Sequence, residues 1–164
     1  MAKNKEEKTN VMRVLEQKKI AYTPHSYPHE EGIAVDGVTV AQSMGFDPAI
    51  VFKTLVARGA SKQYYVFDVP VAENLDLKKA AKAVGEKSIE MIHQKELLPL
   101  TGYVHGGCSP VGMKKLFPTV FHETAENLET MIVSAGKIGY QVEVAPQALI
   151  ALVRAGTAEL TIES

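Results

Sequence analysis

The feature that most constrains the fold is a pair of segments rich in β-branched and aromatic residues, 51–57 and 64–69. Only residues 58–63 separate them, and so short a connection predicts an antiparallel hairpin with a longer turn. Within the first segment side chains alternate between two faces, so Lys53 shares a face with Val51 and Leu55. We therefore expect a sheet built around this hairpin.

Short helices and strands alternate along the rest of the chain. Helices are predicted after the cap Thr9, over 38–44 before Gly45, from the cap Asp76 to Gly85, over 94–98 before Pro99, and from Pro146 to near Gly156. Strands are predicted over 20–26, 119–121, 130–133, 140–144 and 159–162. This mixture predicts an α+β fold: a compact single domain over residues 1–164, with a barrel-like mixed β-sheet surrounded by short helices and with residues 1–8 frayed.

The composition excludes several classes of protein. A formal net charge of -1 argues against a protein that coats nucleic acid by bulk electrostatics, so any RNA contact would need a local patch or a partner. The single cysteine, Cys108, rules out an intramolecular disulfide and suits a reducing compartment. Neither a signal peptide nor a bilayer-spanning apolar run is found. We therefore expect a cytoplasmic protein without membrane association.

Lys53 is the first candidate for chemistry. It lies between two large aliphatic residues on its strand face, and lysine is rarely buried fully unless it is paired. In one interpretation this face is exposed and the lysine only covers its neighbours with its aliphatic stem. In the other, Lys53 places a cation at the mouth of a pocket, where it would hold a phosphate, a carboxylate or a polarised carbonyl. Periodicity by itself favours the first interpretation, and both stay open.

The second candidate is the glycine-rich segment from Gly102 to Gly112, which also contains Pro110. Such a segment can aim several backbone N–H groups at one point and form an anion or oxyanion site, although a purely structural loop is at least as common. A nucleotide-binding P-loop is excluded because Met113 occupies the position of the required lysine. The turn at 134–139 is a third candidate, since its small residues would allow a ligand to approach the backbone.

A protein nucleophile and a metal site are both poorly supported. Cys108 has His105 close by in sequence, but a lone cysteine is more often a small buried hydrophobe than a catalytic thiolate. His25 and His29 have helical ligand spacing in a segment that prolines keep from being helical. No Gly-x-Ser-x-Gly elbow occurs. We expect neither a metal ion nor another cofactor.

Four segments in order resemble the YbaK/EbsC family of Cys-tRNA(Pro) deacylases, which is related to the editing domain of bacterial prolyl-tRNA synthetases. The segments are Phe52-Lys53-Thr54-Leu55, residues 74–81, the glycine-rich segment 102–112, and Val133-Ser134-Ala135-Gly136. The likeness runs from about residue 11 to residue 162. It implies a compact α+β fold and a trans-editing enzyme, hydrolase or lyase, that serves translation fidelity by removing cysteine from mischarged tRNA(Pro), and in some members from Cys-tRNA(Cys).

By position, the resemblance implies Lys53, Gly106 and Ser134 as catalytic residues. It implies a substrate-binding set made of Tyr27, Thr54, Gly107, Cys108, Ser109, Pro110, Ala135 and Gly136. The implied partners are the acceptor end of the mischarged tRNA and prolyl-tRNA synthetase. The implied mechanism needs no protein nucleophile, because the substrate's own thiol attacks the ester carbonyl and forms a cyclic thiolactone. Two alternatives stay open: a deacylase for another small amino acid such as alanine, and a non-catalytic binding or regulatory module.

Overall fold

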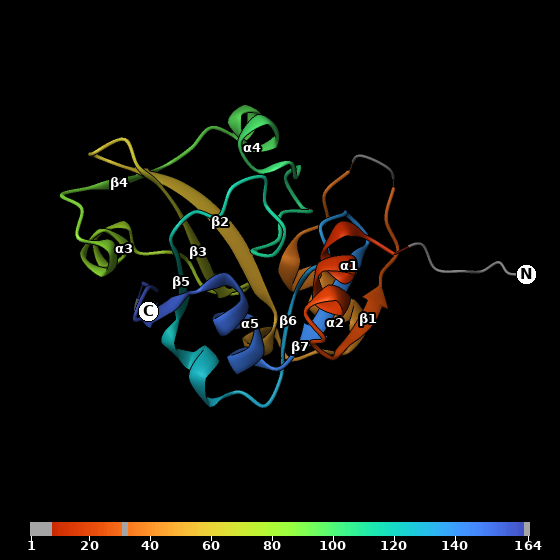
Figure 1. Cartoon of the computed structure of the whole chain (residues 1–164). Helices are drawn as coiled ribbons and strands as arrows, with labels where there is room; N and C mark the ends of the chain where they lie inside the picture. The colour runs from red at the N-terminus through yellow and green to blue at the C-terminus, as the bar shows by residue number, and fades with distance from the viewer. Residues whose placement is uncertain (1–7, 31–32, 163–164) are drawn as a thin grey trace, which may run out of the picture.

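The computed structural model describes residues 8–30 and 33–162 (Figure 1). Its helices are α1 (Asn10–Gln17), α2 (Gly37–Met44), α3 (Leu77–Val84), α4 (Gln94–Thr101) and α5 (Pro146–Val153), with 3-10 turns η1 (Pro48–Ile50) and η2 (Glu123–Asn127). Its strands are β1 (Tyr22–Ser26), β2 (Phe52–Gly59), β3 (Tyr64–Pro70), β4 (Ile89–Met91), β5 (Thr119–His122), β6 (Met131–Ser134), β7 (Tyr140–Val144) and β8 (Gly156–Ala158). The predicted α+β class is confirmed. Most of the region predicted to fray, residues 1–7, lies outside the described residues.

The strands form two open sheets. The larger has the order β4-β2-β3-β5-β8, in which β2 and β3 form the predicted antiparallel hairpin and β5 runs parallel to both β3 and β8. The smaller is the antiparallel sheet β1-β7-β6, which lies with α1 and α2 at the other end of the molecule (Figure 1). A parallel bridge between Val51 and Ile132 joins the two sheets. Neither described sheet closes on itself, so the barrel-like arrangement predicted from the sequence is not confirmed.

The hairpin is apolar on both faces because both faces are covered. One face of β2 and β3, with Phe52, Val56 and Val66, packs on α1, α5 and the smaller sheet in the largest hydrophobic cluster. The opposite face packs on α3, through Ala80 and Ala81. A strand covered on two sides reads as a nearly continuous hydrophobic run, which is why segments 51–57 and 64–69 stand out in the sequence.

Local capping signals place the helices as expected. The Thr9 hydroxyl accepts from the Met12 N–H at 3.2 Å, and Asp76 accepts from the N–H groups of Lys78 and Lys79. Gly45 and Gly85 end α2 and α3 in the left-handed conformation, with φ of 78° and 76°. These caps satisfy backbone groups that the helix itself leaves without partners.

One predicted helix end is wrong. The helix over 94–98 continues through Pro99 to Thr101. Proline removes one backbone donor, yet the last turn is held by other contacts: Thr101 Oγ1 donates to the Leu97 carbonyl at 2.8 Å, and the Gly102 N–H donates to the Leu98 carbonyl at 2.8 Å. Leu97 is also packed into the main hydrophobic cluster, so tertiary contacts outweigh the local penalty.

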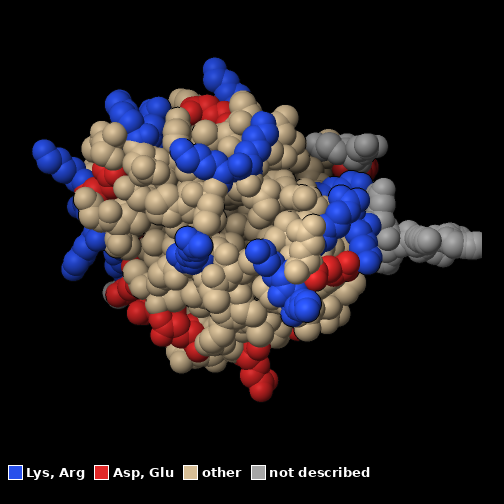
Figure 2. Space-filling model, in the orientation of Figure 1, with Lys and Arg blue, Asp and Glu red and all other residues tan. Residues whose placement is uncertain are grey.

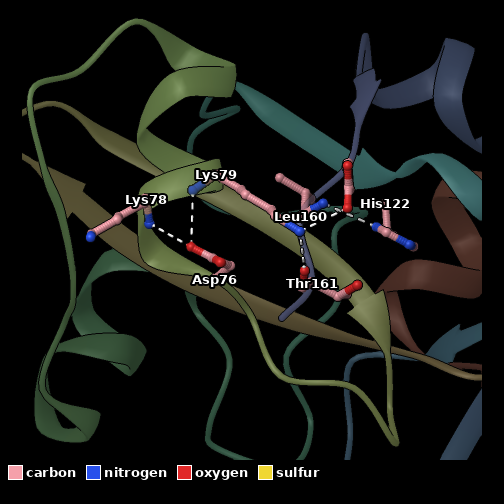
Figure 3. A network of polar contacts seen from close by, with 7 residues as sticks. Asp76, Lys78, Lys79, His122, Leu160 and Thr161 are labelled. Atoms are coloured by element: carbon pink, nitrogen blue, oxygen red, sulfur yellow. Dashed lines mark hydrogen bonds and ion pairs between the residues drawn. The ribbon is translucent and has the colours of Figure 1, made fainter. Parts of the chain in front are cut away.

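The predicted closing strand over 159–162 is also misplaced. Strand β8 comes earlier, and Leu160 is fully buried with its N–H donating to His122 Nδ1 at 3.1 Å (Figure 3). Lys79 Nζ donates to the Thr161 carbonyl at 2.8 Å, so this end of the chain is tied to α3 (Figure 3). The segment also pairs with residues 74–76 through two backbone hydrogen bonds, from the Asp76 N–H to the Leu160 carbonyl at 2.7 Å and from the Ile162 N–H to the Asn74 carbonyl at 3.0 Å, which make an isolated antiparallel bridge and not a full strand. The short strand β4 lies in a region for which the sequence predicts no strand.

Candidate functional site

Four segments that are far apart in sequence supply most of the lining of a cavity of about 470 Å³, to which Tyr27, Val71 and Leu97 also contribute. The four segments are the turn leading into α2, the first half of β2, the glycine-rich loop after α4, and the facing ends of β6 and β7. The edge of β2 away from β3 pairs with β4 only from Ala57 onward. Over residues 52–55 this edge has no strand partner in the described chain, so side chains from both faces of β2 border the cavity.

Lys53 lies in the wall of this cavity and is half-buried. Desolvation by burial lowers the pKa of its ammonium group, while the more distant carboxylates of Asp36 and Glu73 act in the opposite direction. No carboxylate oxygen of residues 8–30 or 33–162 lies within the 4.0 Å of an ion pair to Lys53 Nζ. A half-buried cation without a close counter-ion can attract an anionic or strongly polar ligand group. This arrangement supports the pocket interpretation of Lys53 over the exposed-face interpretation.

Thr54 connects the cavity to a buried acid. Its hydroxyl is hydrogen-bonded to Asp68 Oδ1 at 2.6 Å, and Asp68 lies directly across the hairpin on β3 with no exposed surface. Burial raises the pKa of Asp68 to about 8, although the hydrogen bond with Thr54 acts against the shift. The other carboxyl oxygen, Oδ2, is buried without a hydrogen-bond partner among the described residues.

The glycine-rich loop is held rigidly against the core. The Tyr103 hydroxyl donates to the Val111 carbonyl at 2.5 Å, and Ser109 Oγ accepts from the Val111 N–H at 3.3 Å. Gly106 has φ of 90°, and a Cβ on it would lie 2.6 Å from the Cβ of Ala34. Glycine is therefore needed here both for backbone conformation and for the close approach of the loop before α2.

Two residues of this loop that line the cavity have backbone N–H groups without a partner among the described residues. Gly106 and Cys108 both line it, and their N–H groups have no hydrogen-bond acceptor in the part of the chain that the structure describes. The Gly107 N–H, by contrast, donates to the Val104 carbonyl at 2.9 Å. The loop thus leaves two of its N–H groups free to meet a ligand oxygen.

The structure brings together only part of the site expected from the sequence. Tyr27, Lys53, Thr54, Gly106, Cys108 and Ser134 line the cavity. The other expected residues do not line it and serve the surrounding packing: Gly107, Ser109, Pro110, Ala135 and Gly136. Gly107 lies against the backbone of residues 137–138, and Gly136 lies against the ring of Tyr103.

Three polar residues of the cavity were not among the sequence-based candidates: Asp36, Tyr140 and Gln141. Asp36 caps α2 by accepting from the Thr39 N–H at 3.1 Å. Gln141 lies directly across from Ser134 in the β6–β7 pair, and its Oε1 is buried without a hydrogen-bond partner among the described residues. In the sequence, Gln141 is one residue of an ordinary strand pattern, and nothing in that pattern predicts that it lines a cavity. Only strand pairing shows that it faces the cavity with Ser134.

A cysteine nucleophile is not supported by the geometry. The Cys108 side chain is buried, and desolvation, together with the nearby Asp68 carboxyl group, raises its pKa to about 12. His105 lines the same cavity but is exposed, and no hydrogen bond joins the two side chains among the described residues. Nor does any group of three or more His, Cys, Asp or Glu side chains in this part of the chain have the arrangement of a metal site.

The raised pKa of Cys108 predicts an unreactive thiol. Because only the thiolate attacks alkylating reagents, iodoacetamide at pH 8 should label the native protein about 10³-fold more slowly than the same protein unfolded in denaturant. Mass spectrometry of timed samples measures both rates. Rapid labelling of the native protein would contradict the assignment and revive the cysteine-nucleophile hypothesis.

Comparison with known proteins shows similarity to aminoacyl-tRNA editing proteins. The family model described as "Aminoacyl-tRNA editing domain" matches residues 34–152. A curated protein of Enterococcus faecalis (strain ATCC 700802 / V583), named "Putative Cys-tRNA(Pro)/Cys-tRNA(Cys) deacylase EbsC", is 46% identical over 162 residues, which are 98% of this chain and 98% of that protein.

Solved structures show the same fold. The crystal structure of a "putative trans-editing enzyme for prolyl tRNA synthetase" has a TM-score of 0.80 at 25% identity and covers 96% of this chain and 100% of its own. A hypothetical protein has a TM-score of 0.82 at 18% identity, covering 93% of this chain and 99% of its own, and supports the fold alone. No helix in the described part of the chain combines the length and apolar character that a membrane crossing needs.

Proposed function

The chain belongs to the aminoacyl-tRNA editing domain family, and on that premise we propose that it deacylates mischarged Cys-tRNA(Pro), and also Cys-tRNA(Cys). The observation that carries the proposal is Lys53, a half-buried cation in the wall of the cavity without a close counter-ion among the described residues. Such a cation suits the phosphate or ribose of a tRNA 3′ end. The 46% identity to EbsC supports cysteine as the amino acid that is removed from the tRNA.

The dimensions and chemistry of the cavity agree with such a ligand. A volume of about 470 Å³ lies within the usual range of small-molecule sites, so an aminoacyl group and part of the terminal ribose can enter together. Gln141 Oε1, which has no hydrogen-bond partner among the described residues, is the acceptor we assign to the α-ammonium group. The free N–H groups of Gly106 and Cys108 are donors for the ester carbonyl oxygen as negative charge develops on it.

In the proposed mechanism the substrate supplies its own nucleophile. The cysteine Sγ attacks the ester carbonyl carbon, a C–S bond forms, the bond to the ribose 3′ oxygen breaks, and the thiol proton passes to that oxygen. The products are free tRNA and a cyclic thiolactone, which water opens to cysteine. The protein has to hold the ester, the amine and the ribose in one orientation and stabilise the oxyanion. Lys53 holds the ribose or phosphate in this scheme.

A purified-protein assay with a panel of mischarged tRNAs tests the proposal. Cys-tRNA(Pro) and Cys-tRNA(Cys) should be deacylated, while Ser-tRNA(Pro), which differs at one atom, should react at least about 10²-fold more slowly because a hydroxyl is a weaker nucleophile. S-methylcysteinyl-tRNA is the matched control, since its sulfur is blocked. Hydrolysis of Ala-tRNA at a comparable rate would exclude thiol assistance and favour the alternative specificity. No turnover of any of these tRNAs would leave the binding-module hypothesis.

We also propose that the protein acts in the cytoplasm, where tRNA is charged, and that prolyl-tRNA synthetase recruits it to the mischarged tRNA. The net charge of -1 supports weak tRNA affinity for the chain alone. On the face drawn in Figure 2, Lys and Arg side chains are separated by uncharged surface and do not form one continuous patch. The tRNA panel run with and without the synthetase tests recruitment. We further propose that residues 1–164 form one editing domain, since the match to EbsC covers 98% of both chains.

A further inference from the structure

Asp68 is a buried acid that has no role in the mechanism proposed above. Its side chain on β3 has no exposed surface and lies on the same sheet face as Thr54, its register partner on β2. Asp68 Oδ1 and Thr54 Oγ1 are 2.6 Å apart, and Asp68 Oδ2 has no hydrogen-bond partner among the described residues. The Thr54 side chain is therefore the single hydrogen-bonded link between this carboxyl group and the cavity that Thr54 lines.

Among the described residues, the groups around Asp68 provide no positive charge. Cys108 of the glycine-rich loop is close enough to interact electrostatically with it and remains neutral, because its pKa is about 12. Phe121 is the register partner of Asp68 on β5. Lys53 and His122 are on the neighbouring strands, but strand alternation directs them to the opposite face of the sheet.

A fully buried carboxyl group without a cation is stable only in its neutral form. Its raised pKa of about 8 agrees with this geometry. A neutral carboxyl has an O–H donor that the carboxylate lacks, and a proton carried on Oδ1 reverses the direction of the hydrogen bond to Thr54. Next to a carboxylate, the Thr54 proton is directed at Asp68 and only lone pairs face the cavity. When the neutral acid carries its proton on Oδ1, the Thr54 hydroxyl accepts from Asp68 and its own proton is free to turn to the cavity.

We propose that Asp68 is a positioning residue: in its neutral form it donates to Thr54 Oγ1 and thereby makes the Thr54 hydroxyl a hydrogen-bond donor to the ester of the aminoacyl-tRNA. The inference rests on the proposed deacylase function and adds a residue that acts through Thr54. The deacylation step then depends on a proton held behind the cavity wall. When the pH rises through the pKa of Asp68, the Thr54 donor is lost.

The test compares the pH profile of kcat/KM for Cys-tRNA(Pro) in the wild-type protein and in Asp68→Asn. The asparagine amide cannot ionise and keeps a donor to Thr54 Oγ1 at every pH, whereas wild-type Asp68 loses it on the alkaline side. Dividing the wild-type kcat/KM by the Asp68→Asn kcat/KM at each pH removes effects that the two proteins share, namely ionisation of the substrate thiol and spontaneous ester hydrolysis. The wild-type to Asp68→Asn ratio should fall about 30-fold between pH 7 and pH 9.5, as expected for a single group with the pKa of about 8.

Three further variants separate positioning from a purely structural role. Asp68→Leu keeps the volume but removes the donor, so it should lower kcat at least about 30-fold at pH 7 with little change in KM, and the difference from the wild type should shrink toward pH 9.5, where the wild-type protein has lost the donor as well. In a Thr54→Val background, exchanging Asp68 for asparagine should no longer change the pH profile, because the group through which it acts is gone. Thr54→Ser, which retains a hydroxyl, should restore the wild-type profile.

A titration that needs no substrate separates failure of this inference from failure of the proposed function. With aspartate labelled by carbon-13 at the side-chain carboxyl, the NMR signal that is missing in Asp68→Asn should titrate near pH 8. A signal that titrates near pH 4, or an unchanged profile in Asp68→Asn, overturns the inference and leaves the deacylase function intact. If the wild-type protein turns over no aminoacyl-tRNA, the proposed function fails and this inference fails with it, whatever the titration shows.

Discussion

Replacing Lys53 with alanine is expected to lower kcat/KM for Cys-tRNA(Pro) deacylation by about 10²- to 10³-fold, the effect typical of a group that stabilises charge in a closed site. The ammonium group borders the cavity, and no carboxylate among the described residues is close enough to share its charge. Single-turnover deacylation with purified protein measures the loss.

The fold should survive this substitution. Burial already disfavours the charged form of Lys53, so removing the charge relieves a desolvation cost and should leave the melting temperature within a few degrees of the wild-type value. Lys87→Ala, at an exposed lysine beyond α3, is the matched control for loss of one positive charge and should keep full activity. Full activity in Lys53→Ala would mean that the lysine does not hold the substrate.

Lys53→Arg refines the same experiment. Arginine keeps the positive charge but replaces a compact ammonium group with a larger, planar guanidinium group. Because the guanidinium cannot occupy the same position in the cavity wall, the charge alone should not restore full activity. Partial recovery relative to Lys53→Ala is expected. Full recovery would indicate that Lys53 acts as a general positive charge and not as a positioned hydrogen-bond donor.

The second large effect is expected from Gly106→Ala. Its φ of 90° is unfavourable for alanine, and the new methyl group would lie 2.6 Å from the Cβ of Ala34. The glycine-rich loop and the segment before α2 must then separate, which moves the Gly106 and Cys108 N–H groups away from the ester. We expect about 10²-fold lower kcat/KM together with a loss of about 1–3 kcal/mol in the free energy of unfolding.

Gly45→Ala separates the effect of the positive φ from the effect of the contact with Ala34. Gly45 has a similar φ of 78°, but a Cβ there meets no atom within 4 Å, and Gly45 does not line the cavity. It should therefore show the backbone penalty, about 1–2 kcal/mol in urea unfolding, with unchanged deacylation. If Gly106→Ala keeps the activity of Gly45→Ala, the free N–H groups of this loop do not contact the substrate.

Pro99 and Asp36 show where local signals fail. Proline is a strong local stop signal, yet α4 passes through it because Leu97 is buried in the core and Thr101 closes the last turn. Asp36 caps α2 through a local contact with the Thr39 N–H, but nothing local shows that it borders the cavity. The course of α4 through Pro99 and the place of Asp36 at the cavity depend on contacts with residues remote in sequence.

The sequence by itself determined the α+β class, the central hairpin, and the capped ends of α1 and α3. These features depend on local backbone preferences and on the period of apolar residues, which act over a few neighbouring positions.

The tertiary structure alone decided which residues contact one another. Strand pairing put Gln141 across from Ser134 and Asp68 across from Thr54, because register joins residues that no local pattern relates. It also placed Gly107, Ser109, Pro110, Ala135 and Gly136 in the packing around the cavity and not in its lining. Burial, a property of the whole fold, then raised the pKa of Asp68 to about 8 and that of Cys108 to about 12.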